Sequence, residues 1–406
     1  MFSRLARRCR GLQMGGMADA QPAHSTPPQL EVEGNKLTVL SGGEDRLAAL
    51  LGLIAGAREQ LRVLYYIFED DESGRAVRDA LLEACGRGVK VAILVDGFGS
   101  DAASDALFQP LIDADCRFCR FAPRWGRRYL LRNHQKLVLA DQDKVLVGGF
   151  NVSDEYFAGP ESGAWRDLGL CVSGPGAACL AAYFDDLFAW TSASHGRIRD
   201  LRRMLTRHSG DSGALRWLFG GPTRRLNPWA RALKTDMLRA RTLDMIAAYF
   251  APSRAMLRRI TGIARRGRSR VVTASKSDNG ATIGAARHTY HRLLRRGVEL
   301  YEYQRTKLHT KLIVVDDVVH IGSANFDMRS LYLNLEMMLR VEDPAFAAVM
   351  RAYVDGEIKD SRRITPALHR QQRTLFNRFK WGLCYFIVAT MDYNVSRRLN
   401  FGMDRA

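Results

Sequence analysis

A short pattern of a histidine, a lysine and an aspartate occurs twice in this 406-residue chain. Neutral imidazole can attack an electrophilic centre and an ammonium can bind an anionic oxygen, so the pair suits attack on a phosphate group. Two such pairs supply one nucleophile, one acid and two cations, which is enough to cleave a phosphodiester without a metal. The two copies are His134, Lys136 and Asp141, and His309, Lys311 and Asp316.

The residues after each histidine and lysine predict the elements that hold them. Residues 137–139 and 312–315 are apolar runs typical of strands buried on both faces. Side chains two positions apart point to the same side of a strand, so each histidine and lysine would project together. Each run then leads into a turn of small residues that ends in asparagine, at 148–151 and 322–325.

One histidine and lysine at this spacing is more often a surface pair than a catalytic one. Two copies, each with the same run and turn behind it, are hard to attribute to chance, and we interpret both as functional. They resemble the paired H-x-K-x4-D signatures of the phospholipase D superfamily. From about residue 37 to residue 342 the chain is similar to bacterial cardiolipin synthases, for example in GGFNVSDEY (148–156), YEYQRTKLHTK (301–311) and ANFDMRS (324–330).

The resemblance implies a fold and a set of roles. The expected fold is α/β, with two phospholipase D-type α-β-α sandwich repeats on mixed sheets, related by a pseudo-twofold axis and sharing one active site. It implies a transfer through a phosphohistidine, with His134 as nucleophile and His309 as acid and base, an assignment that the near-symmetry makes reversible. The residues expected to bind the phosphoryl oxygens are Lys136, Lys311, Asn151 and Asn325, with Ser323 assisting and Gly149 at the matching place in the first copy.

Acidic residues complete the candidate site. Asp167 and Glu336 follow the two turns, where family members place the acids that orient the histidines. Asp141 and Asp316 belong to the motif, and so to the candidate catalytic set, although we expect them to support strand and loop structure rather than contact substrate. No metal or cofactor is expected.

The acceptor of the transferred group decides between activities. A second phosphatidylglycerol would give cardiolipin and glycerol, which the resemblance favours, whereas water would give a phospholipase D-type hydrolase. A nonspecific nuclease or phosphodiesterase of the same superfamily is a further alternative. A lipid-binding module without catalysis is disfavoured, because the histidine and lysine are intact in both copies.

Composition indicates the kind of partner. Lys and Arg number 61 and Asp and Glu 43, so the net charge is +18 and a polyanionic partner is expected. The resemblance favours an anionic membrane containing phosphatidylglycerol over nucleic acid, and no protein partner is indicated. The longest apolar runs, 47–57 and 381–391, fall short of the roughly 20 residues of a spanning helix. Seven cysteines without a framework spacing favour reduced thiols. We therefore expect a peripheral protein on the cytoplasmic side of the cell membrane.

Alternating strand and helix patterns divide the chain into repeats. A disordered basic tail (1–30) precedes the first repeat (31–195), and the second repeat follows at 240–360. In the first repeat the patterns predict a helix over 44–62, a strand over 63–68, a helix over 74–86 and a strand over 89–95. In the second repeat they predict a helix over 240–247 and a strand over 270–274.

Three basic segments carry aromatic residues. Residues 123–132 would lie beside the site opening, where they contact substrate or cover an edge. Residues 196–239 are interpreted as a basic linker whose Trp217, Phe219 and Trp229 favour membrane contact over nucleic-acid binding. The basic amphipathic segment 361–406 contains the apolar stretch 381–391, which fits either an interfacial anchor or a helix packed on the core.

Overall fold

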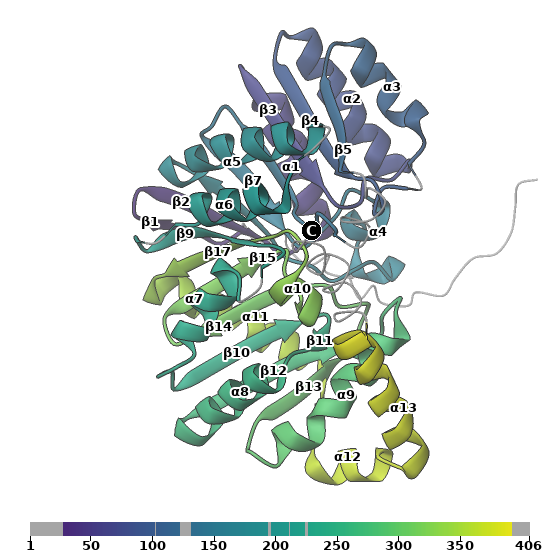
Figure 1. Cartoon of the computed structure of the whole chain (residues 1–406), viewed down its shortest axis with the longest axis vertical. Coiled ribbons are helices and arrows are strands. Elements are labelled where there is room, and N and C mark those ends of the chain that lie inside the picture. Colours follow the sequence, from purple (N-terminus) through teal and green to yellow (C-terminus); the bar gives the residue numbers. More distant parts are fainter. Residues whose placement is uncertain are drawn as a thin grey trace, which may run out of the picture.

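The computed structural model describes residues 27–391, except 102, 122–130, 194–195, 211 and 224–225 (Figure 1). Most of the basic tail and most of the segment 123–132 therefore lie outside the described residues. Two eight-stranded mixed sheets flanked by helices, together with one two-stranded sheet, form the described part. This arrangement confirms the α/β prediction.

The first sheet belongs to the first repeat. Its strand order is β1-β2-β8-β7-β6-β3-β4-β5. Strands β3, β4 and β5 run parallel, whereas β6, β7, β8 and β2 pair antiparallel. The strands are β1 (Gln29–Val32), β2 (Asn35–Leu40), β3 (Gln60–Tyr65), β4 (Lys90–Asp96), β5 (Arg117–Phe121), β6 (Leu137–Ala140), β7 (Lys144–Gly148) and β8 (Gly169–Ser173). The helices are α1 (Gly43–Gly56), α2 (Glu72–Gly86), α3 (Asp105–Asp113), α4 (Asp154–Phe157) and α5 (Pro175–Ser192).

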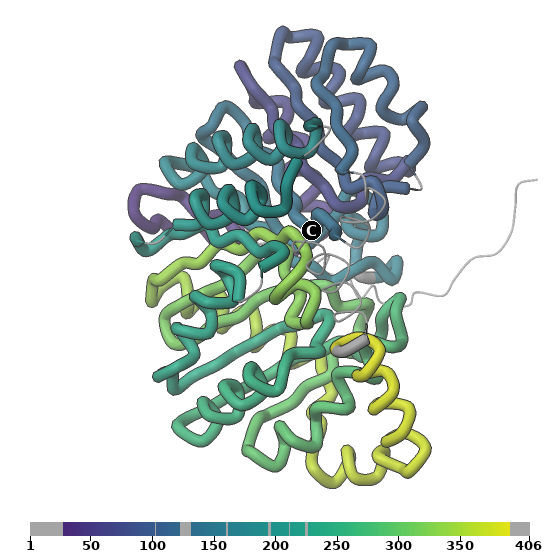
Figure 2. The backbone as a smooth tube through the Cα atoms, in the orientation of Figure 1, coloured from purple at the N-terminus to yellow at the C-terminus, as the bar shows by residue number. Residues whose placement is uncertain are grey.

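The second sheet repeats this plan. Its order is β18-β13-β12-β10-β14-β15-β17-β9, so its six middle strands correspond to β5, β4, β3, β6, β7 and β8 of the first. The strands are β9 (Leu215–Gly220), β10 (Thr242–Ala247), β12 (Arg268–Ala274), β13 (Glu299–Tyr303), β14 (Lys311–Val315), β15 (Val318–Gly322), β17 (Glu336–Glu342) and β18 (Ser361–Ile364). The helices are α6 (Ile198–His208), α7 (Pro228–Asp236), α8 (Arg254–Arg266), α9 (Gly280–Leu294), α10 (Met328–Tyr332) and α11 (Pro344–Lys359). The short strands β11 (Phe250–Ala251) and β16 (Phe326–Asp327) pair in parallel. The two repeats occupy opposite halves of the molecule (Figure 2).

One predicted helix is wrong and a second is predicted too long. Residues 240–247 contain β10, a central strand that pairs with β12 on one side and β14 on the other. The helix predicted over 44–62 extends too far. Helix α1 ends at Gly56, and residues 60–62 already belong to β3, which begins at Gln60. Burial in the sheet, which local sequence does not reveal, decides both segments.

The segment interpreted as a linker is part of the fold. Strand β9 pairs with β17 at the edge of the second sheet, and α6 and α7 pack beside it. Trp217, Phe219 and Trp229 are at most 3% exposed. The expectation that these aromatic residues face a membrane is therefore wrong, since they belong to the core.

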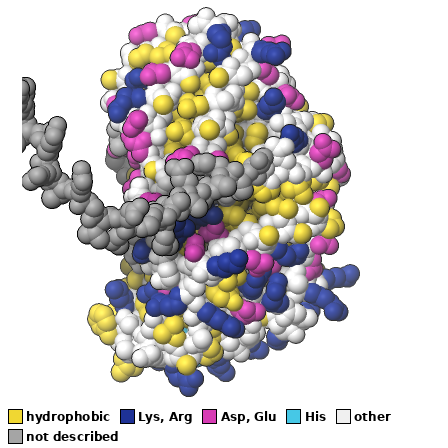
Figure 3. Space-filling view, turned by 180° about the vertical axis from the view of Figure 1, so that it is seen from behind, with side chains coloured by type: hydrophobic (Ala, Val, Ile, Leu, Met, Phe, Trp, Pro, Cys, Tyr) yellow, Lys and Arg dark blue, Asp and Glu magenta, His cyan; other side chains and the backbone are white. Residues whose placement is uncertain are grey.

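The C-terminal segment forms α12 (Pro366–Gln372), α13 (Leu375–Tyr385) and a π-helical stretch, η2 (Phe386–Met391). Helix α13 packs along α9 at one corner of the molecule. Seen from behind, that corner presents hydrophobic and basic side chains (Figure 3). None of the helices in the described ranges has both the length and the apolar character needed to span a bilayer.

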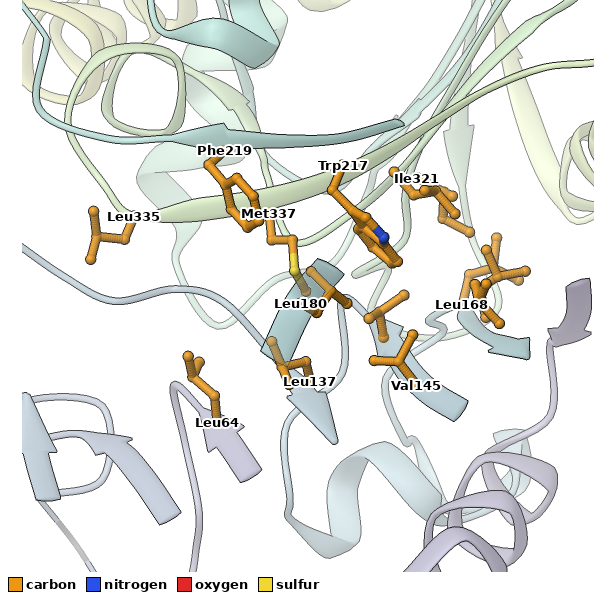
Figure 4. Packing of buried hydrophobic residues seen from close by; sticks show 14 of the residues in the cluster. Leu64, Leu137, Val145, Leu168, Leu180, Trp217, Phe219, Ile321, Leu335 and Met337 are labelled. Carbon is orange, nitrogen blue, oxygen red and sulfur yellow. The ribbon is translucent and has the colours of Figure 1, made fainter. Parts of the chain in front are cut away.

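One hydrophobic core joins the repeats. Leu137 and Leu180 of the first repeat lie in the same cluster as Trp217, Ile321 and Met337 (Figure 4). Both sheets turn one face toward this cluster, and separate clusters fill their outer faces. The two repeats are therefore held as one body with a site at their junction.

Candidate active site

Each histidine and lysine stands at the start of a central strand. His134 and Lys136 directly precede β6, and Lys311 is the first residue of β14 with His309 two positions earlier. The histidines thus lie just before the strands rather than within them. Strand β6 lies between β3 and β7, and β14 between β10 and β15, which fixes both segments in the sheets.

The two segments are bound to each other's repeats. The backbone N–H of His134 donates to the carbonyl of Leu335 at 2.9 Å. In the second repeat, the N–H of His309 donates to the carbonyl of Arg166 at 2.8 Å. This exchange places each histidine beside the acidic residue that follows Leu335 or Arg166 in the sequence.

Each histidine consequently bonds to a carboxylate of the other repeat. The Nδ1 atom of His134 lies 3.1 Å from Oε2 of Glu336, and Nδ1 of His309 lies 2.6 Å from Oδ2 of Asp167. All four side chains are buried. A proton held on Nδ1 by the carboxylate leaves Nε2 unprotonated and able to act as a nucleophile or base.

Burial keeps both imidazoles neutral. Desolvation and the neighbouring ammonium of Lys311 lower the pKa of His309 to about 3. Desolvation and Lys136 also lower the pKa of His134. Burial alone would raise the pKa of Asp167, but Lys311 and His309 lower it below its usual value. The resting site therefore holds neutral histidines next to ionised acids.

The two lysines form the cationic part of the site. The ammonium of Lys136 donates to the carbonyl of His134 at 2.6 Å, and Lys311 makes the equivalent bond to the carbonyl of His309. Desolvation lowers the pKa of Lys136 to about 7 and that of Lys311 to about 8. An anionic ligand would favour their charged forms, because opposite charges attract strongly in a buried site.

Gly149 and Ser323 occupy matching positions but differ in function. A Cβ on Gly149 would lie 2.5 Å from Oδ1 of Asp167, so only glycine leaves room for that carboxylate. The Ser323 hydroxyl donates to Glu336 at 2.5 Å and accepts from the N–H of Met337. Ser323 therefore holds a carboxylate in this state, whereas the sequence predicted contact with a phosphoryl oxygen.

Asn151 and Asn325 are both buried at the site. The Oδ1 atom of Asn151 accepts from the N–H of Ile67 at 3.2 Å. By contrast, Oδ1 of Asn325 is buried without a hydrogen-bond partner among the described residues. Their predicted contact with phosphoryl oxygens remains a prediction, and the two amides are placed differently.

Aromatic rings that the sequence did not single out as site residues surround the histidines. The ring of Tyr66 lies 4.8 Å from that of His134, and the ammonium of Lys136 lies 5.1 Å from its centre. Around His309 are the rings of Tyr156, Trp165 and, at a greater distance, Tyr249. The motif spacing gave no signal for these contacts, since the rings come from four separate segments, one of them helix α4.

Asp141 and Asp316 directly follow β6 and β14, at the opposite ends of these strands from the motif histidines, so their place in the catalytic set stays a prediction that their contacts do not support. Asp141 accepts from the backbone N–H groups of Arg58, Glu59 and Gln60. Asp316 accepts in the same way from Arg241 and Thr242. Both residues have positive φ, 49° and 46°, in the turn after their strand. Their carboxylates hold the backbone at the start of β3 and β10, which agrees with the supporting role in strand and loop structure expected from the sequence.

Further residues support the site from behind. The buried guanidinium of Arg46 donates to the carbonyls of Asp167 and Tyr156, both at 2.7 Å. Asp96 accepts from the N–H of Asn133 at 2.7 Å and so fixes the start of the first motif. Over the described part of the chain, no group of three or more histidine, cysteine or acidic side chains is placed to hold a metal.

A duplicated α/β fold with two histidine and lysine pairs meeting at one site defines a phospholipase D-like enzyme. The family model described as "Cardiolipin synthase, PLD-like domain" matches residues 50–185 and 235–357. The chain belongs to this family and is a phosphatidyltransferase of the phospholipase D superfamily. The matches confirm the predicted family and fold.

Individual relatives agree with this family. A cardiolipin synthase A of Pseudomonas putida (strain W619) is 32% identical over 82% of this chain and 70% of its own length. A cardiolipin synthase B of Salmonella typhimurium is 31% identical over 87% of each chain. Among solved structures, a phosphatidylserine synthase of Haemophilus influenzae matches with a TM-score of 0.69 and 15% identity, covering 91% of this chain and 96% of its own. That structure supports the fold alone.

Proposed function

We propose that the protein is a cardiolipin synthase that transfers a phosphatidyl group from one phosphatidylglycerol to another. The observation that carries the proposal is the exchange of carboxylates between repeats, which places two oriented histidines and two buried lysines at one site. The names of the relatives, cardiolipin synthases A and B, support the choice of reaction.

In the first step Nε2 of His134 attacks the phosphorus of the donor. A nitrogen–phosphorus bond forms, and the bond from phosphorus to the glycerol headgroup breaks. His309, which takes up a proton on Nε2 when the anionic donor binds beside it, gives that proton to the departing glycerol. Lys136 and Lys311 stabilise the negative charge that builds on the phosphoryl oxygens. Asp167 stabilises the positive charge on His309 while it carries the proton.

In the second step a hydroxyl of the second phosphatidylglycerol replaces glycerol. His309 now accepts the hydroxyl proton, the oxygen attacks phosphorus, and the bond to His134 breaks. Two molecules of phosphatidylglycerol thus give one cardiolipin and one glycerol. Both lipids reside in a bilayer, so we place the protein on an anionic phospholipid membrane, at the cytoplasmic face of the cell membrane.

The test uses purified protein with phosphatidylglycerol liposomes, resolves the lipid products by mass spectrometry and measures released glycerol. We expect cardiolipin and glycerol in equal amounts, and neither product with His134→Ala or His309→Ala. Phosphatidic acid without cardiolipin would make the protein a hydrolase. Degradation of plasmid DNA without any lipid product would overturn the lipid assignment.

A further inference from the structure

Helix α13 is attached to the protein by one face. Trp381 is buried, and the Tyr385 hydroxyl donates to the carbonyl of Pro252 at 2.8 Å. A Cβ on Gly284 of α9 would lie 2.7 Å from Sγ of Cys384, so glycine permits the close approach of the two helices. The helix is therefore docked on α9, which is the second of the two arrangements expected from the sequence.

The opposite face of α13 and the start of η2 are apolar and exposed. Leu375, Phe379 and Leu383 recur every four residues, which places them along one side of the helix. Of the nine large hydrophobic side chains exposed in the described part of the chain, six lie here. They are Leu375 (86% exposed), Phe376 (74%), Phe379 (72%), Leu383 (48%), Phe386 (52%) and Ile387 (37%). An exposed cluster of this kind marks an interaction surface.

The charge along the segment that forms this face has a single sign. Residues 361–391 contain six Lys or Arg and no Asp or Glu. Arg370, Arg378 and Lys380 are exposed, and so are Arg292 of α9 and Arg295 directly after it. Apolar side chains bordered by cations are complementary to an anionic bilayer surface. Figure 3 shows both kinds of side chain at the corner of the molecule that α12 and α13 occupy.

A cavity beside the helix offers a place for a phosphate group. It has a volume of about 340 Å³ and lies between α9 and α12. His369 is 2% exposed, and neither of its ring nitrogens has a partner among the described residues. Burial and the nearby Arg373 lower the pKa of His369 to about 4. The residues that line the cavity are His291, Leu294, Arg295, Pro366, His369, Arg370 and Arg373.

The same helix leads toward the active site. Stretch η2 contacts α10, the helix that begins three residues after Asn325. Helix α9 contacts β11, which pairs with β16 directly after Asn325. A bilayer bound by α13 would therefore lie next to the elements that carry the second half of the site.

We propose that the exposed face of α13, with the cavity between α9 and α12, binds the surface of an anionic phospholipid bilayer. The apolar side chains of α13 and η2 enter the boundary between headgroups and acyl chains. Arg295, Arg370 and Arg373 hold a lipid phosphate at the cavity, with His369 as a further hydrogen-bond partner. The inference deepens the proposed function by naming the surface that delivers a bilayer-borne substrate.

The experiment measures co-sedimentation of the full chain with phosphatidylcholine vesicles that contain or lack phosphatidylglycerol. Phe376→Ser with Phe379→Ser removes two apolar contacts, and Arg370→Glu with Arg373→Glu reverses the charge at the cavity. The control is Leu238→Ser, which changes another exposed apolar residue, after α7 and away from this face (57% exposed). Turnover of a short-chain, monomeric phosphatidylglycerol reports the active site without a bilayer.

We expect each double variant to bind the anionic vesicles at least tenfold more weakly than the unchanged chain, while short-chain turnover stays the same and the control binds normally. Equal binding by all variants, or binding that ignores phosphatidylglycerol, would overturn the proposal. A dimer in solution that the Phe376 and Phe379 changes dissociate would instead make this face a contact between copies. Vesicle binding without any cardiolipin product would leave the surface intact and refute only the proposed reaction.

Discussion

The two halves of the active site share a plan but hold their histidines differently. His134 contacts Glu336 and the carbonyl of Ser323 through Nδ1. Glu336 is fixed in turn by the hydroxyls of Ser323 and Ser330. For His309 the described residues provide one partner at Nδ1, the carboxylate of Asp167 at the shorter distance of 2.6 Å.

The difference shows how a duplicated site can divide two roles. The network around Glu336 fixes the ring of His134, as attack along a defined line requires. The close Asp167 carboxylate suits a histidine that must carry a positive charge for part of the cycle. Gly149 makes that carboxylate possible, since a side chain at this position would overlap it. These contacts favour His134 as nucleophile and His309 as acid and base.

Removal of either histidine should have the largest effect. We expect His134→Ala and His309→Ala each to lower kcat for cardiolipin formation by about 10,000-fold or more, because groups that act as a unit fail together. The double variant should be no worse than the single variants, as steady-state rates with phosphatidylglycerol vesicles would show. Substantial activity in either single variant would mean that one half of the site is dispensable.

Changes to the carboxylates of Asp167 and Glu336 should have the next largest effect on kcat, and the two losses should differ in size. We expect Asp167→Asn to lower kcat by about 1,000-fold or more, by analogy with other histidine-orienting acids. Glu336→Gln should cost less, because the carbonyl of Ser323 still contacts Nδ1 of His134. The ratio of the two losses follows from kcat values measured for both variants. Thermal melts control for folding. An equal loss in both would contradict the asymmetry.

The lysines should set the alkaline limit of activity. We expect kcat/KM to fall as pH rises through about 7 to 8, because Lys136 and then Lys311 lose the proton that makes them cations. In the Lys136→Met variant a lower residual activity should fall only at the higher pKa, that of Lys311. A pH profile with a soluble short-chain substrate measures both limits. An unchanged alkaline limit in the variant would exclude Lys136 as its cause.

Exchanging Gly149 and Ser323 tests the difference between the two halves of the site more closely. Gly149→Ser should displace Asp167 and lower kcat by about 10- to 100-fold, since its Cβ would lie 2.5 Å from Oδ1. Ser323→Gly removes a hydrogen bond to the buried Glu336 and should lower the free energy of unfolding by about 1–3 kcal/mol. Rates and urea unfolding of both variants test this division. A larger effect on rate from Ser323→Gly would reverse the expected order.

The motif aspartates should matter least for catalysis. Asp141→Ala and Asp316→Ala each remove the acceptor of several backbone N–H bonds, so we expect a loss of about 1–2 kcal/mol in the free energy of unfolding, as for a helix cap. The rate at saturating substrate should change less than twofold at a temperature where both variants are folded. A large fall in kcat without loss of stability would return these residues to the catalytic set.

The sequence predicted most of the site because its motif is local. His134 and Lys136 lie within three residues of each other, and the turns at 148–151 and 322–325 follow the two histidines at spacings that differ by one residue. The exchange of Asp167 and Glu336 between repeats could not be predicted, since it depends on how two distant segments pair. The positions of the Tyr66 and Tyr249 rings at the site could not be predicted either, because they also depend on how distant segments pack.

The fold was predictable where patterns were long and failed where tertiary contacts decide. The helix predicted over 240–247 is a central strand because β12 and β14 flank it. Trp217 and Trp229 looked like interfacial residues among many arginines, yet an added edge strand and helix bury them. The sequence shows that α13 is rich in apolar residues, but which of these side chains are exposed depends on how the helix packs on α9.

The division of labour between the histidines can be tested by trapping the covalent intermediate. A phosphatidyl ester with a nitrophenolate leaving group needs no proton to depart, so a nucleophile alone can form the adduct. Intact-protein mass spectrometry after rapid quenching at neutral pH would detect the phosphatidyl group on the chain. We predict an adduct in His309→Ala, located on His134, and none in His134→Ala. An adduct in His134→Ala and none in His309→Ala would contradict the account and exchange the two roles.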